Sequence, residues 1–420
     1  MNPRTTTSPR TLCARAISRW RLSGDFPDRL IPEHTDQRNL VQEMIFGTAR
    51  WVRMLEWILD HLVSRQPDPE TEGYLLIGLY QLFRMDNIPA HAAINETVEA
   101  AKADLDPARI RFVNGVLRNA LRQHSEILKS LSRMDDGVRL SHPDILLQRW
   151  IANYGQAAAT ALCEWNNRRP AVVIRLRNRE SAEMATLRTM LQPHPALPEC
   201  FYIVPPGTAI HELPGFADGA FYVQDPATQM AVDLLELKPG MRVLDACAAP
   251  GGKAFACADI LGDHGLVLAA DLHEDRLRRL AENAERMKFS CVRLIQADAT
   301  ALPAASGLRS EAPFDRILLD VPCSNTGVLN RRPDARWRFT EERLIGLLDV
   351  QRRMLDAAVP LLSEGGMIVY STCSLEPEEN LRQLQAWLDV NPTFQRGRQR
   401  ISLPPASGTD GAFAAQLCRK

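Results

Sequence analysis

Apolar residues recur at helical spacing through the first third of the chain. Between residues 40 and 62 they fall on one side of a helix, at Leu40, Met44, Trp51, Leu55, Ile58 and Leu62. The stretch from Tyr74 to Phe83 continues this pattern, and Pro89 and Pro107 stand where proline favours the first turn of a helix. Patterns typical of strands are scarce here. The sequence therefore predicts an all-α domain over residues 1–140.

Short apolar runs replace the helical pattern in the second half of the chain. The runs that we expect to form buried strands are residues 243–244, 266–270, 291–295, 314–319 and 367–370. A helical run opens at Ala254, between the first two of them. Strands that alternate with helices are typical of a parallel sheet covered by helices. We therefore expect an α/β Rossmann-like domain over residues 226–420.

Residues 141–225 resemble neither half and predict a small α+β connector. Ser141-His142-Pro143 interrupts the helical pattern. A strand, a helix and two further strands are expected after it, at residues 171–176, 184–191, 201–204 and 220–223. Apolar and basic residues alternate from Val173 to Arg177, so the basic side chains could contact phosphates or form the solvated face of a half-buried strand.

Composition narrows the class of protein without naming a partner. The chain has 420 residues, of which 45% are hydrophobic, enough for two or three domains. Its net charge of -1 gives no large basic field for nucleic acid. The sequence contains no apolar run of about 18 residues, so we expect no membrane span. Met1 to Arg10 lacks the apolar core of a signal peptide and predicts a disordered start.

A glycine-containing loop from Asp245 to Lys253 follows the first expected strand of the α/β domain and predicts a cofactor site. Gly251 and Gly252 let the backbone approach a ligand, and the helix after them points its free amide groups at the same place. A phosphate-binding Walker loop would need glycine at position 247 and Ser or Thr at 254, where this chain has Cys247 and Ala254. The G-x-G-x-x-G pattern of dinucleotide sites is also absent.

Two carboxylates follow the next two expected strands. Asp271 lies about 20 residues beyond the glycine loop, the spacing at which an acidic side chain meets a ribose diol. Asp298 closes the third strand, where it could accept a hydrogen bond from an adenine amino group. Either residue alone could simply cap a helix or a turn. Their positions at successive strand ends favour the cofactor interpretation.

The chain has nine cysteines, with no C-x-x-C pair and no Cys/His cluster of zinc spacing, so we expect neither disulfides nor a metal site. Reduced thiols fit a cytoplasmic protein. Cys323 and Cys373 differ from the rest because each follows an apolar strand, and both should face the crevice at the carboxyl ends of the strands. Cys247 belongs to the glycine-containing loop. The other six are interpreted as small buried hydrophobic residues, namely Cys13, Cys163, Cys200, Cys257, Cys291 and Cys418.

The loop resembles that of S-adenosylmethionine-dependent methyltransferases, and its Cys-Ala-Ala-Pro-Gly-Gly-Lys wording resembles the RNA cytosine-5 branch. The C-terminal half as a whole resembles the Sun family of bacterial 16S ribosomal RNA cytosine-5 methyltransferases, through Gln224-Asp225-Pro226, Arg332-Pro333-Asp334, Glu378-Glu379-Asn380 and residues 410–413. The N-terminal domain resembles the RNA-binding protein NusB, above all at residues 112–119. Sun-type chains combine these two parts with an RNA-binding α+β connector.

The resemblance implies roles for individual residues. Cys373 would be the nucleophile and Cys323 would help to release the product, because C5 of a pyrimidine becomes nucleophilic only after a thiolate adds at C6. Asp320 would hold the base, while Lys253 would orient Asp320 or the substrate, or only cap the turn. S-adenosylmethionine would be held by Cys247, Ala248, Ala249, Pro250, Gly251, Gly252, Lys253, Asp271, Asp298 and Asp320. At three positions the residue differs from the one that is usual in the motifs of this family, namely Ala254, Val321 and Asn325.

The resemblance thus implies a cytoplasmic, monomeric enzyme that methylates C5 of a cytidine in small-subunit ribosomal RNA, which would be its partner. Two alternatives remain: a transfer RNA cytosine-5 methyltransferase, and a non-catalytic NusB-like RNA-binding or assembly factor. Four arginines that follow the Cys323 motif would border the pocket, at Arg331, Arg332, Arg336 and Arg338.

Overall fold

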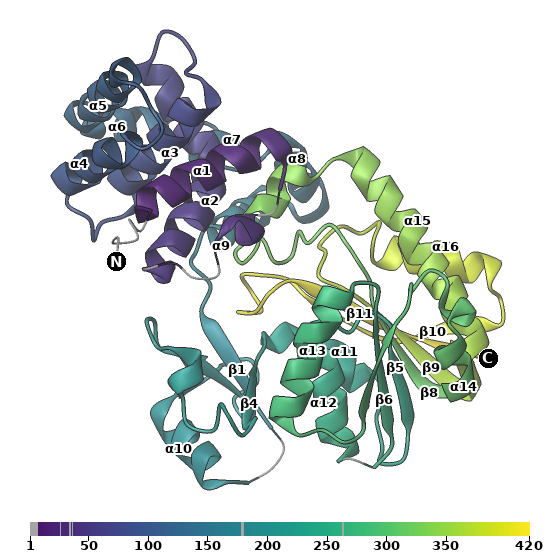
Figure 1. Cartoon of the computed structure of the whole chain (residues 1–420). Coiled ribbons are helices and arrows are strands. Elements are labelled where there is room, and N and C mark those ends of the chain that lie inside the picture. Colours follow the sequence, from purple (N-terminus) through teal and green to yellow (C-terminus); the bar gives the residue numbers. More distant parts are fainter. Residues whose placement is uncertain (1–6, 26, 33–34, 36, 178–179, 263) are drawn as a thin grey trace. The chain divides into compact units, whose positions relative to one another are not determined.

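The chain folds into two compact units (Figure 1). The helical unit comprises Met1–Arg168 and the returning segment Leu329–Arg338, and the sheet unit comprises Arg169–Val328 and Phe339–Lys420. The computed structural model describes residues 7–25, 27–32, 35, 37–177, 180–262 and 264–420. No helix within these ranges has the length and apolar character that crossing a membrane requires.

The N-terminal domain is all-α, as the apolar periodicity predicts. Its helices are α1 (Pro9–Ser23), α2 (Arg38–Leu62), α3 (Pro69–Arg84), α4 (Ala90–Ala101), α5 (Pro107–Arg122), α6 (His124–Leu131) and α7 (Asp136–Arg139). The compact unit continues through α8 (Asp144–Tyr154) and α9 (Gln156–Asn166). The predicted disordered start is wrong for Pro9 and Arg10, which begin α1, while residues 1–6 lie outside the described ranges.

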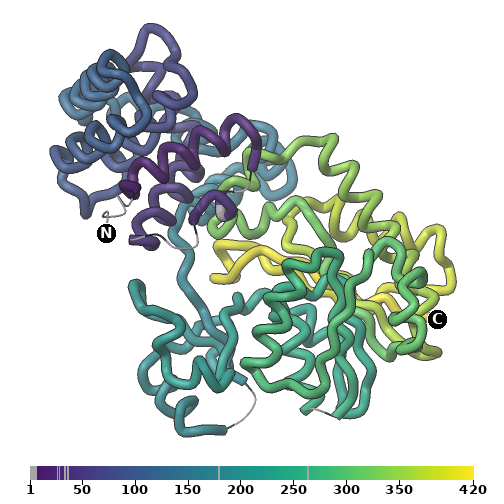
Figure 2. Tube along the Cα trace, in the orientation of Figure 1, coloured from purple at the N-terminus to yellow at the C-terminus, as the bar shows by residue number. Residues whose placement is uncertain are grey.

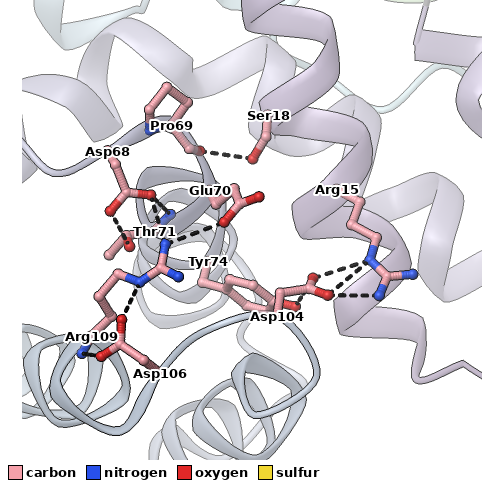
Figure 3. Close-up of polar contacts among 10 residues, drawn as sticks. All are labelled: Arg15, Ser18, Asp68, Pro69, Glu70, Thr71, Tyr74, Asp104, Asp106 and Arg109. Atoms are coloured by element: carbon pink, nitrogen blue, oxygen red, sulfur yellow. Dashed lines mark hydrogen bonds and ion pairs between the residues drawn. The ribbon is translucent and has the colours of Figure 1, made fainter.

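Carboxylates cap the starts of α3 and α5, and an arginine links the two helix starts (Figure 3). Asp68 caps α3 by accepting from the Thr71 amide, and Asp106 caps α5 by accepting from the Arg109 amide. The Arg109 guanidinium donates to Asp106 at 2.8 Å and to Glu70 at 3.2 Å, so it ties the two helix starts together. Most charged side chains in this corner are therefore already paired within the protein.

The returning segment Leu329–Arg338 packs into the helical unit through Arg336. This side chain is 0% exposed and donates to the backbone oxygens of Ser141 at 3.0 Å and Asn166 at 3.1 Å, and to Asn167 Oδ1 at 2.9 Å. Burial lowers the pKa of Arg336 to about 9, and the nearby Arg50 charge adds to this effect. The expectation that Arg336 borders the pocket is therefore wrong, because its guanidinium is buried and donates to backbone oxygens and to Asn167 within the helical unit.

The connector forms a four-stranded sheet with the order β2-β3-β1-β4, and its neighbouring strands pair antiparallel. Its elements are β1 (Val172–Leu176), α10 (Ala182–Met190), β2 (Gln192–Pro193), β3 (Phe201–Val204) and β4 (Phe221–Val223). Arg175 and Arg177 both form ion pairs with Asp259, at 2.8 and 2.7 Å. Their side chains are 6% and 10% exposed, so the predicted phosphate-facing or solvated basic face is wrong.

A seven-stranded sheet with the order β10-β11-β9-β8-β5-β6-β7 forms the rest of the sheet unit. Its strands are β5 (Arg242–Asp245), β6 (Leu266–Asp271), β7 (Val292–Gln296), β8 (Phe314–Asp320), β9 (Leu362–Thr372), β10 (Phe394–Ser402) and β11 (Ala412–Arg419). The five strands from β9 to β7 are parallel, as predicted. The last two strands, yellow in Figure 2, pair antiparallel beside β9 and were not predicted from the sequence.

Helices cover both faces of this sheet (Figure 1), as in Rossmann-like folds. In β5, Leu244 packs beneath the helices of one face, whereas its neighbour Val243 packs beneath those of the other. The two sets of helices are α14 (Ser306–Glu311), α15 (Glu341–Ala358) and α16 (Leu381–Val390), and α11 (Gln229–Leu234), α12 (Gly252–Leu261) and α13 (Glu274–Met287). The carboxyl ends of the parallel strands therefore share one edge, where loops can form a site.

Candidate active site

The glycine loop leaves β5 and turns directly into α12. Gly251 caps the helix with φ of +114°, and a Cβ there would lie 2.4 Å from the Phe255 ring, so only glycine fits. The loop is fixed from outside because Tyr222 donates its hydroxyl to the Pro250 oxygen at 2.9 Å and the Ala248 amide donates to the Ala270 oxygen at 2.9 Å. The backbone of residues 245–253 is thus held rigidly at the carboxyl edge of the sheet.

Asp245 supplies a buried acceptor at the base of this loop. It is 1% exposed, and its Oδ1 accepts from the Cys247 amide at 3.4 Å. In the part of the chain that the structure describes, its Oδ2 has no hydrogen-bond partner from the protein. Burial raises the pKa of Asp245 to about 7, the Asp320 charge adds to this rise, and Lys253 opposes it. Since buried polar atoms are normally paired, this oxygen fits a donor group on a bound molecule.

The two predicted cofactor carboxylates have different surroundings. Asp271 ends β6, is buried, and accepts from the Ala249 amide at 3.3 Å and the His273 amide at 3.1 Å. It therefore touches the glycine loop directly. Asp298 follows β7, is exposed, and its Oδ1 accepts from both the amide and the hydroxyl of Thr300 at 2.8 Å. This oxygen caps a turn, and backbone hydrogen bonding from Thr300 lowers the pKa of Asp298.

Lys253, the last residue of the loop, pairs with Asp320 at the end of β8. The ammonium donates to Oδ2 at 2.6 Å, and the Ser371 hydroxyl donates to Oδ1 at 3.0 Å. Burial alone would lower the pKa of Lys253, but the Asp320 charge and hydrogen bond outweigh it and raise the pKa. These two hydrogen bonds hold the Asp320 carboxylate in one orientation beside the glycine loop.

Cys323 and Cys373, which follow β8 and β9, lie side by side. Their sulfur atoms are 3.3 Å apart. A hydrogen bond with Cys373 and burial raise the pKa of Cys323 well above that of a free thiol, and the Cys373 and Glu379 charges add to the rise. The two loops are joined further by the Gly327 amide, which donates to the Cys373 oxygen at 2.9 Å. The structure thus brings together two thiols that stand 50 residues apart in the chain.

Asn325, one of the residues that depart from the family motif, lies beside the pair of thiols. Its φ of +61° is left-handed, a conformation that Asn tolerates better than most residues other than glycine. The side-chain amide donates to the Cys323 oxygen at 2.9 Å, and the Cys373 thiol donates to Oδ1 at 3.2 Å. This residue therefore contacts one sulfur directly and holds the backbone that carries the other.

Three polar residues in the site were missed by sequence reasoning. Asp245 ends an apolar run as Asp271 does, so its position offered a signal. Ser371 stands two residues before Cys373, and a serine at this position gives no sequence signal of a hydrogen bond to Asp320. Glu379 is 0% exposed, yet its place in a Glu-Glu pair after a proline indicates a solvated turn. Only the fold brings these side chains to the cysteines and to Asp320.

Two family models match the two parts of the chain. The model described as "16S rRNA methyltransferase RsmB/F" matches residues 232–418, and the NusB family model matches residues 7–122. Both parts of the resemblance seen in the sequence are thereby confirmed.

Among curated relatives, "Ribosomal RNA small subunit methyltransferase B" of Pseudomonas putida is 37% identical over 99% of this chain and 95% of the relative. The protein of the same name from Yersinia pestis is 35% identical over 98% of each chain. Among solved structures, PH0851 superposes with a TM-score of 0.79 at 21% identity, covering 98% of this chain and 99% of that one. A methyltransferase homologue from Pyrococcus horikoshii gives a TM-score of 0.59 at 25% identity, covering 69% and 99%. With full-length relatives at this level of identity, the chain belongs to the RsmB/F family of 16S rRNA methyltransferases.

Proposed function

We propose that this protein transfers a methyl group from S-adenosylmethionine to C5 of a cytidine in 16S ribosomal RNA, through a covalent adduct on Cys373. The observation that carries the proposal is the pair of thiols 3.3 Å apart at the ends of adjacent strands. The Lys253–Asp320 ion pair links the neighbouring strand end to the glycine loop. A cofactor-dependent methylation at a carbon that must first be activated by a thiol uses all of these groups.

The residues at the carboxyl edge of the sheet fit the cofactor. Its amino-acid part carries ammonium donors that match the unpaired Oδ2 of Asp245, and the buried Asp271 suits the ribose diol. The groups that would hold it are the loop from Cys247 to Lys253, together with Asp271, Asp298 and Asp320. S-adenosylmethionine supplies an electrophilic methyl group on a sulfonium sulfur.

Cys373 would act as the nucleophile. Its thiolate adds to C6 of the cytosine, a C6–S bond forms, and the electron pair of the C5–C6 double bond moves to C5. C5 can then take up a methyl group. The target base must leave its stack to reach the sulfur. Cys373 is the less buried of the two thiols, as an attacking group requires.

Asp320 would hold the cytosine by its amino group or ring nitrogen. Because Lys253 and Ser371 donate to different oxygens of this carboxylate, it cannot rotate freely. A fixed acceptor orients the base with C6 toward Cys373, and such positioning contributes several orders of magnitude in rate. Lys253 therefore acts through Asp320 in this proposal.

Cys323 would assist product release. After methylation, C5 loses its proton to solvent, the C5–C6 double bond re-forms and Cys373 departs as a thiolate. The raised pKa of Cys323 keeps this sulfur protonated at neutral pH, so its S–H can donate to the departing Cys373 sulfur. Without that donor, the leaving group is poorer and the adduct should persist.

The RNA substrate is proposed from the relatives, which are named as methyltransferases of the small ribosomal subunit. The NusB-like part of the helical unit and the α+β connector would bind the RNA, and the protein would work in the cytoplasm as a monomer. The connector would use groups other than Arg175 and Arg177, whose charges are paired with Asp259.

Bisulfite sequencing of 16S ribosomal RNA tests this function. A strain that lacks the protein should lose one methylated cytidine, and the wild-type gene should restore it. The matched control is the gene with Cys373→Ala, which should not restore the methylation although the protein accumulates. If the methylation pattern of 16S ribosomal RNA is unchanged in the deletion strain and a transfer RNA cytidine loses its methyl group instead, the proposed substrate is wrong.

A further inference from the structure

We propose that Glu379 is a positioning residue, which holds the Cys323 and Cys373 loops in register by binding the serine that follows each cysteine. This inference rests on the proposed function for its catalytic meaning, but the geometry stands by itself. Glu379 lies in the turn between β9 and α16, close to Cys373 in the chain but far from Cys323. Its side-chain contacts with the two cysteine loops are made to the serines, Ser324 and Ser374.

One carboxylate oxygen bridges the two loops. Oε2 accepts from the Ser324 hydroxyl at 2.5 Å and from the Ser374 hydroxyl at 2.5 Å. Ser324 directly follows Cys323 and Ser374 directly follows Cys373, so the same atom fixes equivalent points of the two loops. The two hydroxyls are also 3.0 Å from each other. A change in the position of this carboxylate would therefore move both cysteines at once.

The other oxygen fixes the Cys323 loop from a second side. Oε1 accepts from the Ser324 amide at 2.9 Å and from Gln351 Nε2 at 3.0 Å. The same Gln351 amide also donates to the Pro322 oxygen at 3.0 Å, so the residues before and after Cys323 are both tied to one group. The Tyr370 hydroxyl completes the arrangement: it lies 2.8 Å from the backbone oxygen of Glu379 and 3.1 Å from Gln351 Oε1, and its one proton is shared between these two acceptors.

Burying a carboxylate without a cation among its contacts costs free energy of folding, so this residue is not explained by packing alone. Glu379 is 0% exposed, and its four side-chain contacts are an amide, a side-chain amide and two hydroxyls. Four hydrogen bonds to a charged acceptor offset that cost. The Ser324 amide and hydroxyl attach the Cys323 loop to this carboxylate, and the Ser374 hydroxyl attaches the Cys373 loop.

The charge of Glu379 also acts on the Cys323 thiol. It contributes to the raised pKa of Cys323, after the hydrogen bond with Cys373 and burial. It also contributes, after burial, to the raised pKa of Tyr370. The titratable groups that face Cys323 are thus Cys373, Glu379 and Tyr370. Loss of the Glu379 charge should therefore lower the pKa of Cys323.

The test compares Glu379→Ala, Glu379→Gln and the control Glu378→Gln in the full-length protein. Glu378 is the neighbouring carboxylate and pairs with Arg382 near the surface. On 16S ribosomal RNA transcribed in vitro, Glu379→Ala should lower kcat about 100-fold with KM nearly unchanged, since misplaced reacting groups cost rate rather than binding. Glu379→Gln keeps an acceptor and can donate to both serine hydroxyls, so kcat should fall by less than about tenfold.

Two measurements on the thiols test, without RNA, whether Glu379 holds the Cys323 and Cys373 loops together. We call this arrangement of Glu379, Ser324 and Ser374 the clamp. Diamide should oxidise Cys323 and Cys373 to a disulfide, with diamide taking up the two hydrogens, more slowly in folded Glu379→Ala than in the wild type and at the wild-type rate in Glu378→Gln. In Glu379→Gln the loops stay in place and the pKa of Cys323 falls, so the rate should equal or exceed that of the wild type. The pH at which iodoacetamide half-modifies Cys323 should fall in Glu379→Gln. Wild-type kcat and a wild-type disulfide rate in Glu379→Ala would overturn the proposal. If the wild type methylates no RNA, the proposed function fails while the disulfide rates still decide the clamp.

Discussion

Cys323 and Cys373 end neighbouring strands of one sheet, yet their surroundings differ. Cys323 is 8% exposed and its pKa is raised well above that of a free thiol, first by the hydrogen bond with Cys373 and then by burial. Cys373 is half-buried and donates to Asn325. A buried protonated sulfur suits hydrogen bonding to its neighbour, and a more accessible one suits attack. Position after a strand therefore identifies two candidate thiols, and their difference in burial supports the different roles that we propose for them.

The largest effect is expected for Cys373→Ala. Loss of the nucleophile should lower kcat/KM for 16S ribosomal RNA by roughly 10⁴-fold or more, because C5 is no longer activated. Radiolabelled methyl transfer measures this rate, and calorimetry of S-adenosylmethionine binding serves as the control, since the cofactor residues are untouched. Activity within tenfold of the wild type would remove the asserted difference between the two thiols.

Asp271→Ala should separate the cofactor edge of the site from the thiols. Loss of a buried charged acceptor should weaken S-adenosylmethionine binding by roughly 1.5 to 3 kcal/mol. The rate of diamide oxidation of the cysteine pair should stay at the wild-type value. Calorimetry measures the affinity, and an unchanged dissociation constant would place the ribose contact elsewhere.

Alkylation should reveal the unequal thiols directly. A raised pKa leaves less thiolate at a given pH, so at pH 7.5 iodoacetamide should modify Cys323 at least about tenfold more slowly than Cys373. The rate at Cys323 should rise only as the pH exceeds the value of a free thiol. Mass spectrometry of the modified peptides measures both rates. Equal rates at pH 7.5 would contradict the assigned surroundings.

The smallest effect is expected for Asn325→Gly. Glycine adopts the left-handed φ of +61° without strain, so the loop should keep its path. Only the contact with the Cys373 thiol and the bond to the Cys323 oxygen are lost, which should change kcat by about two- to tenfold. A change above 100-fold at unchanged melting temperature would make Asn325 as important as the cysteines.

The sequence predicted the fold where periodicity or turn chemistry was strong. The predicted strands from Val243 to Tyr370 form the parallel sheet, and the apolar spacing from Leu40 to Leu62 gives α2. Strand β10 was missed because its residues between Phe394 and Ser402 are all exposed, so the strand has no apolar alternation. The short apolar run of β11 contains three alanines and does not by itself distinguish a strand from a helix. Helix α1 was missed because its start continues the Thr, Pro and Arg composition of the preceding residues, which is typical of a disordered terminus.

The site was predictable where residues lie beside motif glycines or strand ends. Asp271 contacts the glycine loop and Lys253 contacts Asp320. The two arginines expected at the surface, Arg175 and Arg336, are instead paired with groups inside the protein. No sequence pattern distinguishes an arginine that binds phosphate from one that donates to buried carbonyls. Glu379 shows the same limit, since only tertiary packing makes it a shared acceptor for two loops.

The unequal roles of the two thiols are tested most directly by trapping the adduct. RNA that carries 5-fluorocytidine at the target cannot lose fluorine as a proton, so methylation should stall with the enzyme attached, which a denaturing gel detects as a protein–RNA band. Cys373→Ala should give no band. Cys323→Ala should give the band with 5-fluorocytidine and also with ordinary cytidine, because release is impaired. A band that survives in Cys373→Ala and vanishes in Cys323→Ala would reverse the assignment of nucleophile and release residue.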